Sequence, residues 1–250
     1  MHLLDITIAL TQKELRVRYK HHALGYLWSI ANPIAYALLY FLIFKFIMKI
    51  KIENYPVFLI AGLFPWQWFS NSIGVAPMTY IGNSPLIKKV KFPRHILNFV
   101  VVLQDLIHFV VSIPIIIIAM FYFDLYPTLN WIIGIPLLLI VQLAMTYSFN
   151  VIISTLNLFF RDIEKLVMMA MTFIFYSTPV LYQVDMLPEN VKHLVHLNPC
   201  SSVIMGWKDL FLHGTVNFEY IGIATAWSIL LLLLTRFFYT KLSWRFAEIL

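Results

Sequence analysis

The chain has 250 residues, of which 61% are hydrophobic and only 12% charged, and its formal net charge is +6. A soluble domain carries about twice that charged fraction, so the composition excludes a soluble protein and indicates a polytopic membrane protein. A basic excess is typical of cytoplasmic loops beside a membrane, and without a soluble domain to hold it we expect no nucleic acid partner. The single cysteine, Cys200, excludes an intrachain disulfide framework and a cysteine-cluster metal site, and we expect no bound metal.

The first 22 residues are too charged to cross a membrane. In a helix, Asp5, Lys13 and Arg16 lie on one face, whereas Leu3 and Leu10 lie elsewhere. This pattern predicts an amphipathic helix over residues 1–22 that lies in the cytoplasmic interface of the membrane.

Six later segments are apolar enough to cross a bilayer, which takes about 20 helical residues. These expected spans are 28–46, 57–81, 96–123, 131–158, 166–182 and 220–239. An even number of spans places both termini on one side, where thirteen of the Lys and Arg residues lie, against five on the other side. Because cytoplasmic loops carry the excess of Lys and Arg, both termini are expected in the cytoplasm. Residues 1–250 are therefore predicted to form one all-α transmembrane domain in the cytoplasmic membrane.

The segment "NSPLIKKVKFPR" (83–94), between the second and third spans, carries Lys88, Lys89, Lys91 and Arg94. Each would cost roughly 2.5–3.5 kcal/mol at mid-bilayer, so the segment stays in water. It is either a simple cytoplasmic loop or a docking surface. The charge alone is explained by the loop, but the apolar residues that alternate with the cations favour docking.

The outer loop, 183–219, has two short stretches with an apolar face each. Pro188 suits the first position of one helix, and Gly214 follows the end of the other. The two helices either form a plain outer cap or insert partly into the membrane beside a pathway. Their strong apolar faces favour a re-entrant pair.

Motifs for catalysis are missing from the sequence. No G-x-x-x-x-G-K-[ST] occurs, so the chain has no phosphate cradle of its own, and no H-E-x-x-H occurs. Asp105 and His108 share one face of the third span. They are either a proton relay or a pair that satisfies itself inside the bundle, and we favour the pair.

Aromatic residues recur at helical spacing on the first and fifth spans. They are Tyr36, Tyr40 and Phe44 on the first, and Phe173, Tyr176 and Tyr182 on or near the fifth. Such faces suit the apolar C–H faces of sugar rings. Taken position by position, lipid-facing Phe and interfacial Tyr explain these residues better than a path does.

Five segments, in order, resemble the membrane subunit of the ABC-type exporters of O-antigen, capsule and teichoic acid. They are "RYKHHALGYLWSIANP" (18–33), "NSPLIKKVKFPR" (83–94), "NLFFRDIEKL" (157–166), "STPVLYQVDMLP" (177–188) and "LNPCSSVIMGWKDLF" (197–211). The chain departs from the family pattern at Asn98, where a proline is expected, and at Lys208, where Arg is common.

The resemblance implies that residues 83–94 form a coupling helix that docks on a separate ATPase subunit. The implied docking residues are Pro85, Leu86, Lys88, Lys89, Phe92 and Arg94, flanked by Arg16, Arg18 and Tyr19 and by Arg161 and Asp162. ATP and Mg²⁺ would belong to that partner. This chain would then be a non-catalytic transport subunit without a cofactor.

The resemblance also implies a homodimer with two ATPase subunits, whose pathway lies at the dimer interface and is lined by the aromatic residues of the first and fifth spans. The implied outer gate consists of Pro188, Asn198, Pro199 and Trp207. The expected function is export of a lipid-linked, O-antigen-like polysaccharide across the inner membrane, in contact with its lipids. Alternatives are a drug or lipid exporter of the same architecture, a proton-coupled carrier that uses Asp105 and His108, and a membrane enzyme acting on lipid-linked sugars.

Overall fold

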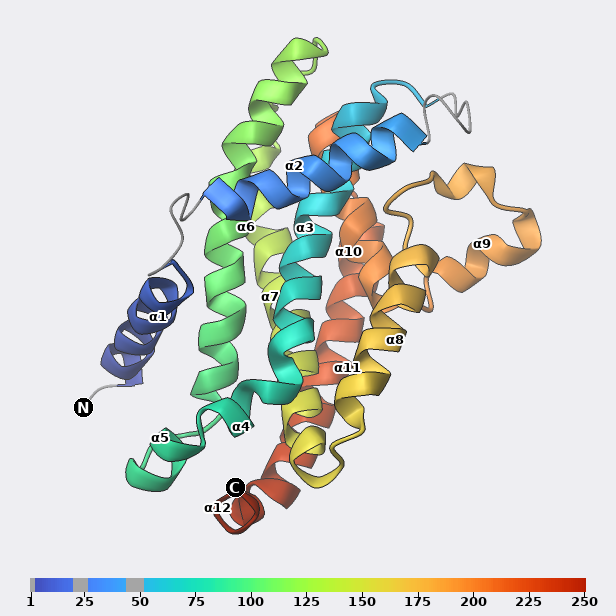
Figure 1. Cartoon of the computed structure of the whole chain (residues 1–250). Helices are drawn as coiled ribbons and strands as arrows, with labels where there is room; N and C mark the ends of the chain where they lie inside the picture. The colour runs from blue at the N-terminus through green and yellow to red at the C-terminus, as the bar shows by residue number, and fades with distance from the viewer. Residues whose placement is uncertain (1–2, 20–26, 44–51) are drawn as a thin grey trace.

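The computed structural model describes residues 3–19, 27–43 and 52–250, and all regular structure within these ranges is helical (Figure 1). Three helices there are long and apolar enough to cross a membrane: α6 (Ile96–Tyr122), α7 (Trp131–Phe159) and α11 (Phe218–Leu242). At about 1.5 Å per residue, α6 is about 40 Å long, more than the hydrocarbon core of a bilayer. The predicted all-helical membrane class is confirmed.

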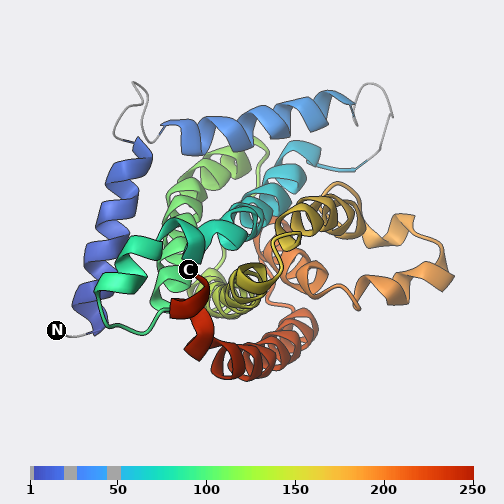
Figure 2. The same cartoon turned by 60° about the horizontal axis from the view of Figure 1, so that its bottom comes forward.

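The other helices surround this frame. α3 (Tyr55–Val75) packs between α2 (Leu27–Leu42) and α6, and continues through a 3₁₀ turn, η2 (Ala76–Met78), into α4 (Thr79–Gly82). α1 (Leu3–Tyr19) lies beside α6, and α8 (Ile163–Ser177) lies on the outside of the bundle near α3 and α7 (Figures 1 and 2). Helix formation over 1–22 is thus confirmed for residues 3–19.

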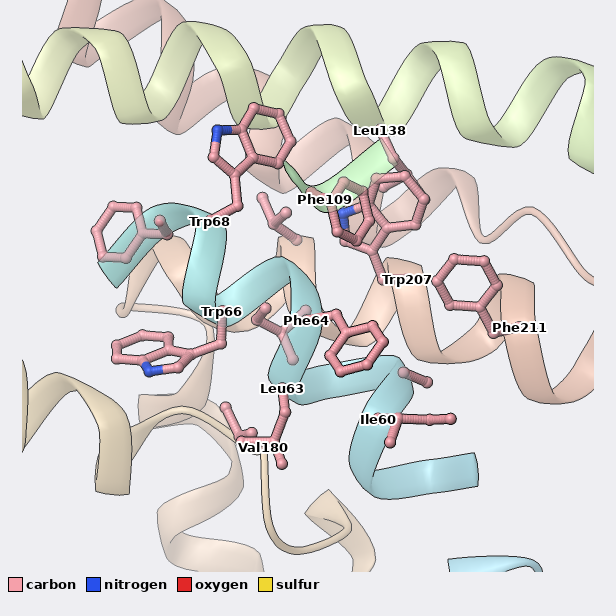
Figure 3. Close-up of a cluster of buried hydrophobic side chains, with 14 of the residues drawn as sticks. Ile60, Leu63, Phe64, Trp66, Trp68, Phe109, Leu138, Val180, Trp207 and Phe211 are labelled. Carbon is pink, nitrogen blue, oxygen red and sulfur yellow. The ribbon is translucent and has the colours of Figure 1, made fainter. Parts of the chain in front are cut away.

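The core is a column of stacked aromatic rings between α3, α6 and α10 (Figure 3). Trp68 stacks on Phe109 at 5.6 Å between ring centroids, Phe109 meets Trp207 edge to face at 4.9 Å, and Trp207 stacks on Phe211 at 5.4 Å. The buried indole N–H of Trp68 has a hydrogen-bond partner, because it donates to the Val102 carbonyl at 3.2 Å. Aromatic pairs of this kind fix the helices more specifically than aliphatic contacts do.

Three of the six expected spans differ from their predictions. The second, 57–81, is divided by η2 into α3, which ends at Val75, and the short α4. Of the expected span 28–46, residues 44–46 lie outside the described ranges, and α2 has only 16 residues and lies across one end of the bundle (Figures 1 and 2). The fifth, 166–182, is the 15-residue helix α8, about 22 Å long. α8 ends at Ser177 because Pro179 forces the preceding Thr178 into an extended conformation, with ψ at 134°.

The outer loop contains the two short helices that were expected, together with two further helical turns. The two are α9 (Glu189–Val195) and α10 (Pro199–Lys208), and the turns are η3 (Val184–Met186) and the π-helical η4 (Asp209–His213). α10 is buried against α3 and α11, whereas α9 projects from the side of the molecule (Figure 1). Pro188 is the N-cap of α9 rather than its first helical residue.

Candidate docking surface and aromatic flank

One end of the bundle gathers three segments that are distant in sequence. They are α5 (Ser84–Lys89), the turn at 160–162 between α7 and α8, and α12 (Phe246–Ile249), which follows the 3₁₀ turn η5 (Ser243–Arg245) (Figures 1 and 2). The expected coupling helix over 83–94 is therefore a six-residue helix followed by an extended Val90. We call residues 83–94 the coupling segment.

The outward face of the coupling segment is cationic. Pro85, Lys88, Lys89 and Lys91 are exposed. Arg161 and Asp162, at the turn before α8, are exposed as well. All of these except Lys91 are predicted docking residues, and all are accessible to a partner.

The inward face of the coupling segment packs on the chain itself. Ile87 is buried with Tyr80, Leu97, Leu158 and Phe246, and the partly buried Leu86, Phe92 and Leu10 join this cluster. This packing explains why apolar residues alternate with lysines. Leu86 and Phe92, which were expected to dock on a partner, instead hold the segment to its own bundle.

The Arg94 side chain also makes its contacts within this chain. Its guanidinium donates to the Ser243 carbonyl at 2.5 Å and lies 5.6 Å from the ring centroid of Phe246. Ser243 is the C-cap of α11, where helix carbonyls lack amide partners and attract cations. Arg94, predicted as a docking cation, thus ties the coupling segment to the C-terminal residues in this structure, and its docking role stays a prediction.

Residues 243–250 were missed by the sequence analysis. Phe246 is fully buried, with its ring 4.9 Å from that of Tyr80 and 5.9 Å from that of Tyr239. Ser84 donates a hydrogen bond to the carbonyl of Leu250 at 3.4 Å. An aromatic residue in the basic stretch after the last span was the only signal in the sequence.

The N-terminal docking residues are only partly described. Arg16 is exposed on α1. Arg18 and Tyr19 belong to the last turn of the same helix, and their side chains lie outside the described part of the structure.

His95, the N-cap of α6, lies just beyond the coupling segment. Its Nδ1 is 3.1 Å from the Tyr147 hydroxyl, and its ring meets that of Tyr239 edge to face at 5.6 Å. Burial lowers the pKa of the His95 imidazole from its ordinary value. The imidazole therefore stays neutral at neutral pH.

The structure brings together aromatic residues of α2 and α8. Tyr36 stacks on Tyr40 at 6.4 Å, Tyr40 lies 5.8 Å from Phe175, and Phe175 lies 5.2 Å from Tyr176. Phe175, which the prediction passed over, connects the two helices and also contacts Trp66 of α3 at 5.4 Å. We call this group the aromatic flank.

Of the other predicted path residues, Phe173 and Tyr182 are described by the structure, and neither joins these ring contacts. Phe173 is 74% exposed, and Phe44 lies outside the described residues. The Tyr182 hydroxyl donates to the Ser177 carbonyl at 3.1 Å, which holds it at the end of α8.

The predicted outer gate divides into surface and core residues. The Asn198 amide donates to the Thr178 hydroxyl at 2.8 Å and so ties the start of α10 to the end of α8. Pro188 is exposed and Pro199 partly buried. Trp207 is corrected from a gate residue to a core residue, because its ring belongs to the aromatic column and its indole N–H donates to Gln142 at 2.6 Å.

Lys208 was counted among the outer charges, yet it is only 5% exposed. Its ammonium donates to the carbonyls of Pro179 at 2.5 Å and Val180 at 2.7 Å, and lies 3.4 Å from the Phe58 ring centroid. Gly62 makes this possible, because a Cβ there would lie 2.6 Å from Lys208 Cε. The buried cation therefore fixes the turn after α8 against α3 and α10.

Asp105 is buried in α6 and accepts a hydrogen bond from the Ser72 hydroxyl of α3 at 2.9 Å. The sequence did not indicate this partner. Across the described ranges, no group of three His, Cys, Asp or Glu side chains could hold a metal ion.

Known proteins resemble this chain over most or all of its length. The O-antigen export system permease protein RfbA of Klebsiella pneumoniae is 45% identical over 249 residues, which cover 100% of this chain and 96% of the relative. RfbA of Myxococcus xanthus is 31% identical, covering 97% and 94% of the two chains. The polysialic acid transport protein KpsM of Escherichia coli is 25% identical, covering 84% and 82%. The ABC-2 type transporter family matches residues 6–212, a range that contains the coupling segment, the aromatic flank and α10, and this chain belongs to that family of membrane proteins.

Proposed function

We propose that this chain is the permease subunit of an ATP-driven exporter that moves a lipid-linked, O-antigen-like polysaccharide across the cytoplasmic membrane. This proposal rests on 45% sequence identity to an O-antigen export permease over the full length of the chain. The cationic end of the bundle agrees with it, since Lys88, Lys89 and Arg161 are exposed where a cytoplasmic subunit would dock.

The motor belongs to a separate subunit in this proposal. Two ATPase subunits, which hold ATP and Mg²⁺, bind a dimer of this chain at the coupling segments, with both termini in the cytoplasm. The sequence has no phosphate-binding loop, which supports the assignment of ATP binding and hydrolysis to the partner subunit. α8 is proposed as one of the membrane-spanning elements, whereas α2, which lies across the bundle (Figure 1), is not assigned as a span.

The polysaccharide path is proposed to follow the aromatic flank between the two copies. Both helices of this flank carry exposed apolar side chains, among them Tyr36 on α2 and Tyr176 on α8. Stacked rings offer apolar surface to sugar C–H faces, while their hydroxyls offer hydrogen bonds. Both features suit a glycan better than a uniformly apolar lipid or drug.

Purification of the tagged chain from its native membranes, followed by mass spectrometry, tests the proposal. The expected result is a stoichiometric subunit that carries a phosphate-binding loop, together with intracellular accumulation of lipid-linked glycan when this chain is deleted. A chain that purifies alone after crosslinking would refute the motor. Normal surface glycan in the deletion strain would refute the substrate.

Tyr40→Ala tests the path. We expect lower surface export of long glycans with unchanged expression, because the ring that bridges Tyr36 and Phe175 is lost. Phe121→Ala, an exposed aromatic residue on α6, is the control. Equal export from both variants would place the aromatic flank against lipid.

A further inference from the structure

The chain connects the coupling segment to the bundle on both sides, and we call these two connections its arms. The first arm, residues 76–82, follows a break at the end of α3, and the second, residues 95–98, leads into α6. Pro77 has no N–H, and the amides of Ala76 and Thr79 turn back three residues, to the carbonyls of Ile73 and Ala76. The α-helical ladder therefore stops at Val75. In a continuous α-helix the Ser72 carbonyl would accept the Ala76 N–H, but here that N–H bonds the Ile73 carbonyl instead.

Side chains of α7 satisfy the carbonyls at this break. The Asn150 amide donates to the Ser72 carbonyl at 2.5 Å. The Ser154 hydroxyl lies within hydrogen-bond distance of the Ala76 carbonyl at 2.7 Å and of the Asn150 carbonyl at 2.6 Å. The Asn157 amide donates to the Pro77 carbonyl at 2.8 Å. The three α7 residues are four and three positions apart, so they share one helix face. All three are buried.

The second arm enters α6 and reaches the same side chains. Asn98, in the first turn of α6, is completely buried. Its amide lies within hydrogen-bond distance of Asn150 Oδ1 at 2.7 Å and Ser154 Oγ at 2.6 Å. Asn98 is also the position where the chain departs from the proline of the resembled family. A proline there would provide no side-chain donor.

Both arms of the coupling segment therefore converge on one point of α7. We propose that Asn98, Asn150, Ser154 and Asn157 are positioning residues for coupled transport, which anchor both arms to α7 so that displacement of the coupling segment moves α7 with it. Buried amide hydrogen bonds suit this task, because they are directional and cannot be exchanged for water.

α7 can pass such a displacement on to the last span. α11 packs along α7. Two of its hydroxyl groups lie within hydrogen-bond distance of α7 carbonyls, Ser228 of Val141 at 3.1 Å and Thr235 of Ser148 at 3.2 Å, and each also lies 2.8 Å from the carbonyl four residues earlier in α11. Without the anchor, the break at Ala76–Met78 is the place where a push on the coupling segment would bend the chain instead of moving the bundle.

The test uses the complex with its ATPase subunit, reconstituted in vesicles, and so rests on the proposed function. Asn157→Leu removes one donor of the anchor and keeps the side-chain size. Gln142→Leu is the control, because Gln142 is also a buried amide of α7 that contacts neither arm: it donates to the Pro65 carbonyl of α3 at 2.7 Å and accepts the Trp207 indole N–H at 2.6 Å. The control bond lies about 22 Å further along α7, far from both arms.

We expect both variants to lose thermal stability, while only Asn157→Leu loses coupling. In Asn157→Leu, the amount of glycan exported per ATP hydrolysed should fall about tenfold, which is within the range typical of coupling between distant sites. ATP hydrolysis and assembly of the complex should be retained. In Gln142→Leu the export per ATP should stay at the wild-type value. Unchanged export per ATP in Asn157→Leu, or equal losses in the two variants, would overturn the proposal. A wild-type complex that hydrolyses ATP without exporting glycan would instead refute the proposed function.

Ser154→Ala, a smaller deletion, serves if Asn157→Leu fails to assemble. Spin labels at Gly82→Cys, where added atoms meet open space, and at Phe160→Cys, an exposed site after α7, report on the first arm. We expect one narrow distance that is the same with and without ATP in the parent chain, and a broad distribution in Ser154→Ala. A parent distance that changes with ATP, or an unchanged distribution in Ser154→Ala, would overturn the anchor.

Discussion

Phe246→Ala should release the C-terminal residues from the coupling segment. The Phe246 ring is fully buried among Tyr80, Tyr239 and the Arg94 guanidinium, and it joins the end of the chain to α4, α11 and the coupling segment. Phe→Ala substitutions in cores cost about 3–5 kcal/mol. α12 has only four residues at the chain end and can collapse into the space, so about 3 kcal/mol is the appropriate value.

That loss should act on a local opening rather than on global unfolding, because residues 243–250 can separate from the bundle alone. About 3 kcal/mol corresponds to about a hundredfold larger open fraction. Hydrogen–deuterium exchange measures this fraction directly, and we expect amides of 243–250 and of the coupling segment to exchange about a hundredfold faster. Phe237→Ala, which removes a 56% exposed ring on α11, should change neither region.

The exchange rates of the coupling segment test whether the C-terminal residues hold it in place. If exchange rises in residues 243–250 while the coupling segment keeps its wild-type rates, the C-terminal residues do not brace the segment. If neither region changes, the buried ring contributes little, and the reasoning from burial is refuted.

Charge reversal of Lys88 and Lys89 to Glu should abolish co-purification of the ATPase subunit, because both ammonium groups are exposed. The control Lys192→Glu, in α9, should leave co-purification unchanged. Retained co-purification in the Lys88 and Lys89 variant would exclude these lysines from docking. Lys208→Met should lower the unfolding free energy by about 2 kcal/mol or more, because two buried carbonyls lose their donor, and an unchanged melting temperature would contradict this. His95 has a folded-state pKa below its unfolded value, so its contribution to stability is complete above about pH 6.5 and is lost as the pH falls through the folded pKa. Melting curves between pH 8 and 5 should show this loss in the parent chain and a smaller one in His95→Gln, and identical curves would refute it.

Sequence alone was sufficient for the membrane class, for α6, α7 and α11, and for the exposed cations of the coupling segment. These features follow from composition along a continuous stretch. A run of more than 20 apolar residues has no stable alternative to a buried or spanning helix, and four cations in seven positions cannot lie in the hydrocarbon core of the membrane. The family resemblance was also readable, because its motifs are local.

Tertiary structure decided the partner of each side chain. Arg94 and Lys88 are similar cations in the same segment, yet Arg94 bonds the end of α11 and Lys88 faces outward. Lys208 and Trp207 look like surface and interface residues in sequence but are buried, because Gly62 and Gln142 of other helices accommodate them.

The same holds for Asn98, whose partners on α7 are more than 50 residues away. The sequence determined which segments become helices and which charges must stay in water, since both depend on local transfer free energy. Only the packed bundle determined which polar groups meet, since a hydrogen bond depends on the distance between atoms that the chain brings together from remote positions.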